Sequence, residues 1–113
     1  MHDESTDGRL RLVTAERSGT PLLVLTGESD HEAVGALDRA LAEAARRDGA
    51  DVRLDLSGVR FADSSLANSL LRGRVALGGR LLLLDPSAPV VRLLDVLGLR
   101  DLFAVHAGSR PRG

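Results

Sequence analysis

Asp63, Ser64 and Ser65 are the residues of this chain best suited to carry out chemistry or to contact a partner. A serine hydroxyl becomes a nucleophile when a histidine accepts its proton and a carboxylate orients that histidine. Ser64 and Asp63 together with His31 or His106 would supply these residue types. The G-x-S-x-G motif that exposes the nucleophilic serine of α/β-hydrolases is absent, so a small serine hydrolase is kept only as a remote alternative.

The same segment also suits the first turn of a helix. Asp and Ser are favoured N-cap residues because their side-chain oxygens accept hydrogen bonds from the free backbone N–H groups. Phe61, just before Asp63, is expected to act as a hydrophobic staple. On the residues alone, capping is the favoured interpretation. The functional alternative is an anion site, because the N–H groups and the macrodipole at a helix start stabilise a phosphate.

Apolar periodicity in the first half of the chain predicts a hairpin, a helix and a strand. Short apolar runs at 10–13 and 22–25 flank turn-forming residues and predict two strands, the second of which Gly27 is expected to end. Ser29 and Asp30 are both suitable N-caps for a helix. Its apolar face recurs at helical spacing over Ala33, Leu37, Ala40, Leu41 and Ala44. Residues 52–56 alternate with charges, as a strand does.

The second half continues the alternation of helices and strands. Ser64 or Ser65 begins a helix that contains Leu66, Leu70, Leu71 and Val75 and ends at Gly78-Gly79. The apolar run 81–84 is typical of a strand covered on both faces. A third helix over 90–97 and a strand over 102–105 complete the order ββαβαβαβ. This order predicts an α/β fold, a mixed sheet with helices as crossovers, over residues 9–106 between flexible termini 1–8 and 107–113.

The composition excludes several kinds of chemistry. The chain has 113 residues, which suits a single domain, and it contains no cysteine. Disulfides, thiolate nucleophiles and cysteine-bound metals are therefore excluded. All fifteen basic residues are arginine, so neither a Walker-type phosphate lysine nor a Schiff base can form. The histidine spacing does not provide a zinc site. We expect no metal and no cofactor.

The charge balance and hydropathy limit the kinds of partner. The formal net charge is −1, whereas a nucleic-acid partner requires a basic face. No apolar run approaches the roughly 20 residues that span a bilayer. The first residues lack the basic and apolar regions of a signal peptide. The sequence therefore predicts a cytoplasmic protein that binds neither nucleic acid nor membrane.

Four motifs occur together in a family-specific order. They are Gly27-Glu28-Ser29-Asp30, then Asp55-Leu56-Ser57-Gly58-Val59 followed by Phe61-Ala62-Asp63-Ser64-Ser65, then Gly78-Gly79-Arg80-Leu81, and finally Leu97-Gly98-Leu99 before Leu102-Phe103. Each is weak alone, but their order and spacing are specific. Over about residues 9–106 the chain resembles the STAS domain family, and in particular the single-domain bacterial anti-sigma factor antagonists.

The resemblance implies a binding protein rather than an enzyme. Such antagonists bind an anti-sigma factor that is also a serine kinase, and thereby release the sigma factor it holds. The resemblance places the phosphorylated residue at Ser64 and assigns removal of the phosphate to a metal-dependent serine phosphatase. Asp63 would orient the hydroxyl and Ser65 would be its capping neighbour. Glu28 and Asp30 would lie in the adjoining loop, also at the partner interface.

The chain departs from the family where the motif usually continues with glycine and then leucine. Here Leu66 precedes Ala67, so the large side chain is moved by one residue, or about 100° around the helix. Leu66 is expected either to add an apolar side chain to the partner interface or to pack inside after a small rotation of the helix. Ser29, in place of the family's apolar residue, is a milder departure. The alternative function is a STAS interaction or scaffold module that is never phosphorylated.

Overall fold

The computed structural model describes residues 11–17, 20–28, 31–47, 49 and 51–106, and it forms one layer of strands and one of helices. The described elements are β1 (Arg11–Arg17), β2 (Thr20–Glu28), α1 (His31–Ala45), β3 (Val52–Phe61), α2 (Ser64–Leu77), β4 (Leu81–Leu84), α3 (Ala88–Val96) and β5 (Ala104–His106). Short 3-10 turns at Gly78–Arg80 and Arg100–Leu102 precede β4 and β5. The order ββαβαβαβ expected from the sequence is confirmed. Residues 1–8 and 107–113, expected to be flexible, lie outside the described part.

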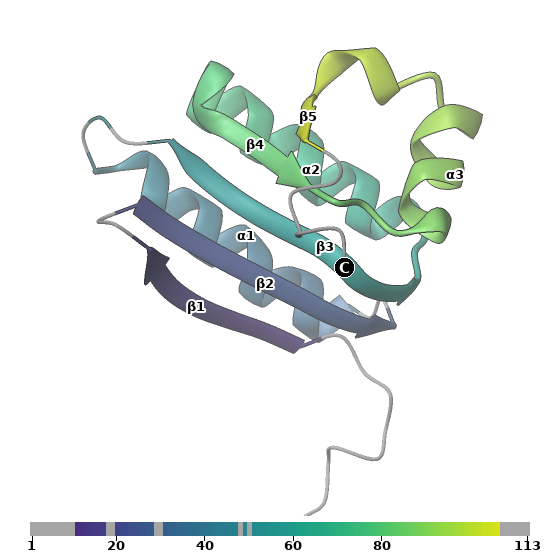
Figure 1. The fold of residues 1–113 in the computed structure, drawn as a ribbon, viewed down its shortest axis with the longest axis horizontal. Coiled ribbons are helices and arrows are strands. Elements are labelled where there is room, and N and C mark those ends of the chain that lie inside the picture. The colour runs from purple at the N-terminus through teal and green to yellow at the C-terminus, as the bar shows by residue number, and fades with distance from the viewer. Residues whose placement is uncertain (1–10, 18–19, 29–30, 48, 50, 107–113) are drawn as a thin grey trace, which may run out of the picture.

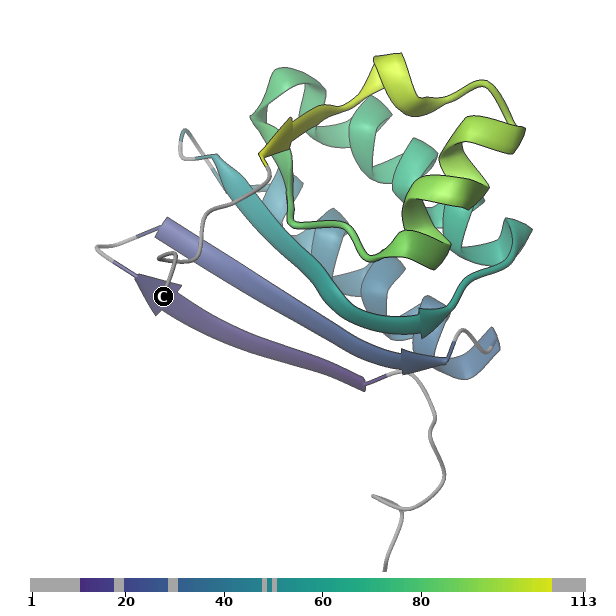
Figure 2. The same ribbon diagram turned by 45° about the vertical axis from the view of Figure 1, so that its right-hand side comes forward.

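The five strands form a mixed sheet in the order β1-β2-β3-β4-β5. The β1–β2 pair is antiparallel, as expected for a hairpin, and the other three pairs are parallel. In Figures 1 and 2, α1 and α2 lie behind the sheet, while α3 lies at the end where β2 and β3 finish. No helix of the described residues is long and apolar enough to cross a membrane.

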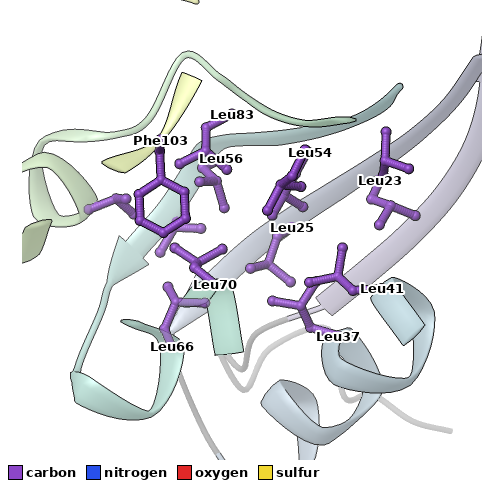
Figure 3. Packing of buried hydrophobic residues seen from close by; sticks show 14 of the residues in the cluster. Leu23, Leu25, Leu37, Leu41, Leu54, Leu56, Leu66, Leu70, Leu83 and Phe103 are labelled. Carbon is purple, nitrogen blue, oxygen red and sulfur yellow. The ribbon is translucent and has the colours of Figure 1, made fainter. Parts of the chain in front are cut away.

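Leucine and valine fill the space between the sheet and the helices. Leu25, Leu37, Leu54, Leu56 and Leu83 are each completely or almost completely buried in one continuous cluster, which also takes in Phe103 (Figure 3). In β3, every second residue from Val52 to Leu56 points into this cluster. The core is therefore aliphatic, as the composition predicts.

Several local expectations are wrong. Gly27 does not end β2 but lies inside it, with a φ of 99° at a shift in the β2–β3 register. β3 runs to Phe61, well beyond residue 56. Leu82 and Leu84 are only half-buried because the described helices lie on the other face of the sheet. The last strand is 104–106 rather than 102–105.

A polar contact joins α1 to α2 across the helix layer. The Oγ of Ser69, a completely buried residue, donates to Oδ1 of Asp38 at 2.6 Å, and Nη2 of Arg72 donates to Oδ2 at 2.8 Å. Burial by itself raises the pKa of the Asp38 carboxyl. The hydrogen bonds from Arg72 and Ser69 and the neighbouring arginine charges outweigh that effect, so the pKa lies below its ordinary value.

We expect Asp38→Asn to lower the free energy of unfolding by up to about 1 kcal/mol at neutral pH, since Arg72 and Asp38 are partly solvated. Asp38→Ala should cost about 1–3 kcal/mol, because it also leaves the buried Ser69 hydroxyl without its acceptor. A carboxyl whose pKa is lowered by folding stabilises the fold above its unfolded pKa and loses this contribution as the pH falls through the folded pKa. Urea unfolding should therefore show a higher stability of the wild type than of Asp38→Asn at neutral pH, and this difference should disappear as acid protonates Asp38 in the folded chain. A difference that persists in acid would contradict an ionic contribution.

Candidate functional site

The carboxyl ends of β2 and β3 meet at one edge of the sheet, where both arrowheads lie in Figure 1. Glu28, the last residue of β2, pairs with Phe61, the last residue of β3. Both side chains are exposed. Since α2 begins at Ser64, this edge carries the Asp63-Ser64-Ser65 segment directly beyond Phe61. The structure thus brings Glu28 and the α2 start to one edge of the sheet.

An unusual segment of β3 carries the strand to this edge. Oδ1 of Asp55 accepts hydrogen bonds from the backbone N and the Oγ of Ser57, at 2.9 and 2.7 Å. The register between β2 and β3 shifts at this place. A Cβ added to Gly58 would lie 2.7 Å from Cγ2 of Thr26, so glycine permits the close approach of the two strands. These motif residues therefore have a structural role: they continue β3 through an irregularity where a turn would otherwise form.

Asp63 is the N-cap of α2. Its backbone is extended (φ −130°, ψ −175°), and its Oδ1 accepts a hydrogen bond from the backbone N of Ser65 at 3.1 Å. Its carbonyl oxygen accepts from the backbone N of Leu66 and Ala67 at 3.0 and 3.2 Å. The capping interpretation is therefore confirmed for Asp63, whose carboxylate is held against the first turn of the helix.

Ser64 remains accessible beside this cap. It is the first residue of α2 and is exposed, whereas its neighbours Asp63 and Ser65 are half-buried. None of the hydrogen bonds among the described residues uses the Ser64 hydroxyl. The first turn of α2 contains no acidic residue. A negative group added at Ser64 would lie at the positive end of the helix, next to the carboxylate of Asp63, the N-cap.

Phe61 does not act as a hydrophobic staple, contrary to the sequence-based expectation. Its side chain is 53% exposed. The residue immediately before the cap is Ala62, which is partly buried against the core. Because Ala62 already occupies the position that packs beneath the first turn, the ring of Phe61 lies outside the core. This exposure could not be predicted from the residue type, since phenylalanine is usually a core residue.

Leu66 is completely buried, which decides between the two expectations for this residue. Figure 3 shows its side chain next to Leu70, one turn further along α2, within the apolar cluster. Ala67 is 1% exposed. Leu66 is thus a core residue and not part of an exposed partner surface, and this corrects its assignment to the interface. Positions 66 and 67 both face inward. The chain differs from the family pattern in which of these two positions carries the large side chain.

The other predicted site residues are only partly placed. Asp30 and Ser29 lie outside the described residues, and the side chain of His31 is likewise not described. His106 is exposed at the end of β5, on the strand at the far side of the sheet from β1 and β2. Among the described side chains, no hydrogen bond joins Ser64 to a histidine. The arrangement provides an accessible hydroxyl at a helix start, with no assembled proton acceptor for it in the described part.

Comparison with known proteins agrees with this geometry. A family model described as "Mlab, STAS domain" matches residues 12–104. The anti-sigma F factor antagonist of Paenibacillus polymyxa is 31% identical over 102 residues, covering 86% of this chain and 86% of that protein. The structure of an anti-sigma factor antagonist from Mycobacterium paratuberculosis aligns with a TM-score of 0.77 at 19% identity, over 89% of this chain and 88% of the other.

The anti-sigma factor antagonist SpoIIAA, in its unphosphorylated form, aligns with a TM-score of 0.68 at 26% identity, over 89% of each chain. The family model covers the sheet and helices from β1 to the start of β5. These relatives share the mixed five-stranded sheet and the three crossover helices. The chain therefore belongs to the STAS domain family.

Proposed function

We propose that this chain is an anti-sigma factor antagonist. It binds an anti-sigma factor that is also a serine kinase, and this binding releases the sigma factor that the anti-sigma factor holds. Phosphorylation of Ser64 by that kinase ends the binding, and a metal-dependent serine phosphatase restores it. The chain itself is not an enzyme and requires no cofactor. The names of the Paenibacillus relative and of SpoIIAA support this proposal.

The observation that carries the proposal is the exposed Ser64 beside a fixed Asp63. A kinase needs a hydroxyl that it can reach, and Ser64 is exposed at the first position of α2. Asp63 accepts a capping hydrogen bond from the backbone N of Ser65, and this bond restrains the backbone that presents the hydroxyl. The positive end of the helix dipole favours an anion at this position, so the fold tolerates a phosphate.

The direct test is incubation of the purified chain with its kinase and ATP. The kinase to use is an anti-sigma factor of the serine-kinase class from the same organism. We expect the intact mass to rise by one phosphoryl group, with the modification mapped to Ser64 and absent from Ser64→Ala. Ser65→Ala is the matched control, since Ser65 is the half-buried neighbour, and it should still be phosphorylated.

Two other results would change the assignment. Stable binding of the anti-sigma factor without any gain of phosphate would contradict the switch and favour an interaction module that acts as a scaffold. Labelling of Ser64 by a serine-reactive phosphonate in the absence of any kinase would favour the hydrolase instead. Neither alternative has an observation in the described structure that favours it.

A further inference from the structure

The two phenylalanines of the chain differ in their burial. Phe103 is 8% exposed and belongs to the core, whereas Phe61 is 53% exposed at the end of β3. Burial of a phenylalanine side chain is favourable in proportion to the apolar area that it removes from water. The unbound chain therefore leaves much of the Phe61 ring in water, and a partner that buried the ring would gain binding free energy.

Phe61 lies close to the proposed switch. The chain from Phe61 to Ser64 spans at most about 10 Å even when extended. The remaining large exposed apolar residues of the described part lie elsewhere, on β1, at the last turn of α2, and from the end of α3 to β5: Val13, Val75, Val96, Leu97, Leu102 and Val105. Of this set, Phe61 is the nearest to Ser64 in sequence.

We propose that Phe61 is the anchor of the interface with the anti-sigma factor, and that its ring inserts into an apolar pocket of that protein. This inference rests on the proposed function and names the contact that supplies the affinity. Buried aromatic anchors surrounded by polar residues dominate many protein interfaces. The surroundings of Phe61 have this composition, with Glu28 beside it in the sheet and Asp63 and Ser64 beyond it.

This placement also explains how a phosphate at Ser64 acts. A phosphoserine carries about −1.5 to −2 charges near neutral pH and is strongly hydrated. Seating the ring of Phe61 would bring that phosphate to the border of an apolar pocket and remove part of its water. Phosphorylation therefore weakens binding by preventing the ring from entering, so the anchor and the switch are energetically coupled.

The first test measures the affinity of the full chain for the anti-sigma factor that phosphorylates it, by isothermal titration calorimetry. Phe61→Ala is expected to weaken binding by at least about 30-fold, the size that defines a hot-spot residue. Phe61→Leu, which keeps an apolar side chain, should lose much less. Thermal unfolding should be nearly unchanged in both variants, because the side chain is half-exposed in the free chain.

Val75→Ala is the matched control. Val75 is 81% exposed and lies near the other end of α2, about 16 Å from Ser64 along the helix. Its replacement should leave the affinity unchanged within about 2-fold. Wild-type affinity in Phe61→Ala, or an equal loss in Val75→Ala, would overturn the inference while leaving the proposed function intact. A wild-type chain that does not bind the anti-sigma factor would overturn both.

A double-mutant cycle tests the coupling between the anchor and the switch. Ser64→Asp should lower the affinity by a smaller factor in the Phe61→Ala background than in the wild-type background, and the two factors should differ by at least about 3-fold. The reason is that the ring that the charge excludes is already missing. Additive effects of the two substitutions would contradict the coupling.

Discussion

Leu66→Ala is expected to lower the free energy of unfolding by about 2–5 kcal/mol. The side chain is completely buried, and it packs with Leu70 in the cluster that joins α2 to the sheet. Its removal loses the transfer free energy of the deleted atoms and leaves a cavity that the neighbouring side chains only partly fill. In a domain of this size a loss of that magnitude is a large fraction of the total stability.

Urea unfolding at neutral pH measures this loss as a lower midpoint with an unchanged slope. Asn68→Ala is the matched control, because Asn68 is exposed on the same helix and its replacement should change the stability by less than about 0.5 kcal/mol. If Leu66 contributed to a docking surface instead, Leu66→Ala would keep its stability and lose affinity for the partner. That outcome would contradict the buried position.

The order of helices and strands could be predicted because each element follows its own period in the sequence. The helical spacing from Leu37 to Ala44 and the apolar run 81–84 are local signals, and both elements form where they were expected. The N-cap at Asp63 is local as well, since capping needs only the residue itself and the turn that follows. These features depend little on the rest of the chain.

The failures occur where distant contacts decide the outcome. Ser57 and Gly58 suggest a turn, but Asp55 holds Ser57, and β2 approaches closely enough for the strand to continue. Whether Leu66 or Ala67 carries the larger core side chain depends on the space above the sheet, because both positions are buried.

The candidate site shows the same division between local signals, which the sequence carries, and exposure, which depends on packing. The motif residues Asp63 and Ser64 could be found from their types and order, and the structure adds that one is a fixed cap and the other is exposed. The exposure of Phe61 could not be found, because it follows from the length of β3, which overruns the core. A pattern of residues predicts which side chains are chemically suitable, whereas the packing decides which of them remain available.

Phosphorylation of Ser64 is expected to lower the affinity for the anti-sigma factor by about 10⁴-fold, the ratio that moves a binding equilibrium from nearly complete to nearly absent. Ser64→Asp adds only one charge and should lower it by at least about 10-fold. The fold should remain within about 1 kcal/mol of wild type, because an acidic residue at the first position of α2 suits the positive end of the helix.

Asn68→Asp is the control for Ser64→Asp, since Asn68 is exposed one turn further along α2 and the substitution adds the same charge. An equal loss of affinity in both variants would mean that net charge, and not the position of Ser64, controls binding. Thermal unfolding of each variant must be measured alongside its affinity. If Ser64→Asp unfolded the domain, the lost binding would reflect a lost fold, and Ser64 would be a structural residue. A stable variant that no longer binds would instead show that the fold tolerates a negative charge at position 64 and that the partner does not.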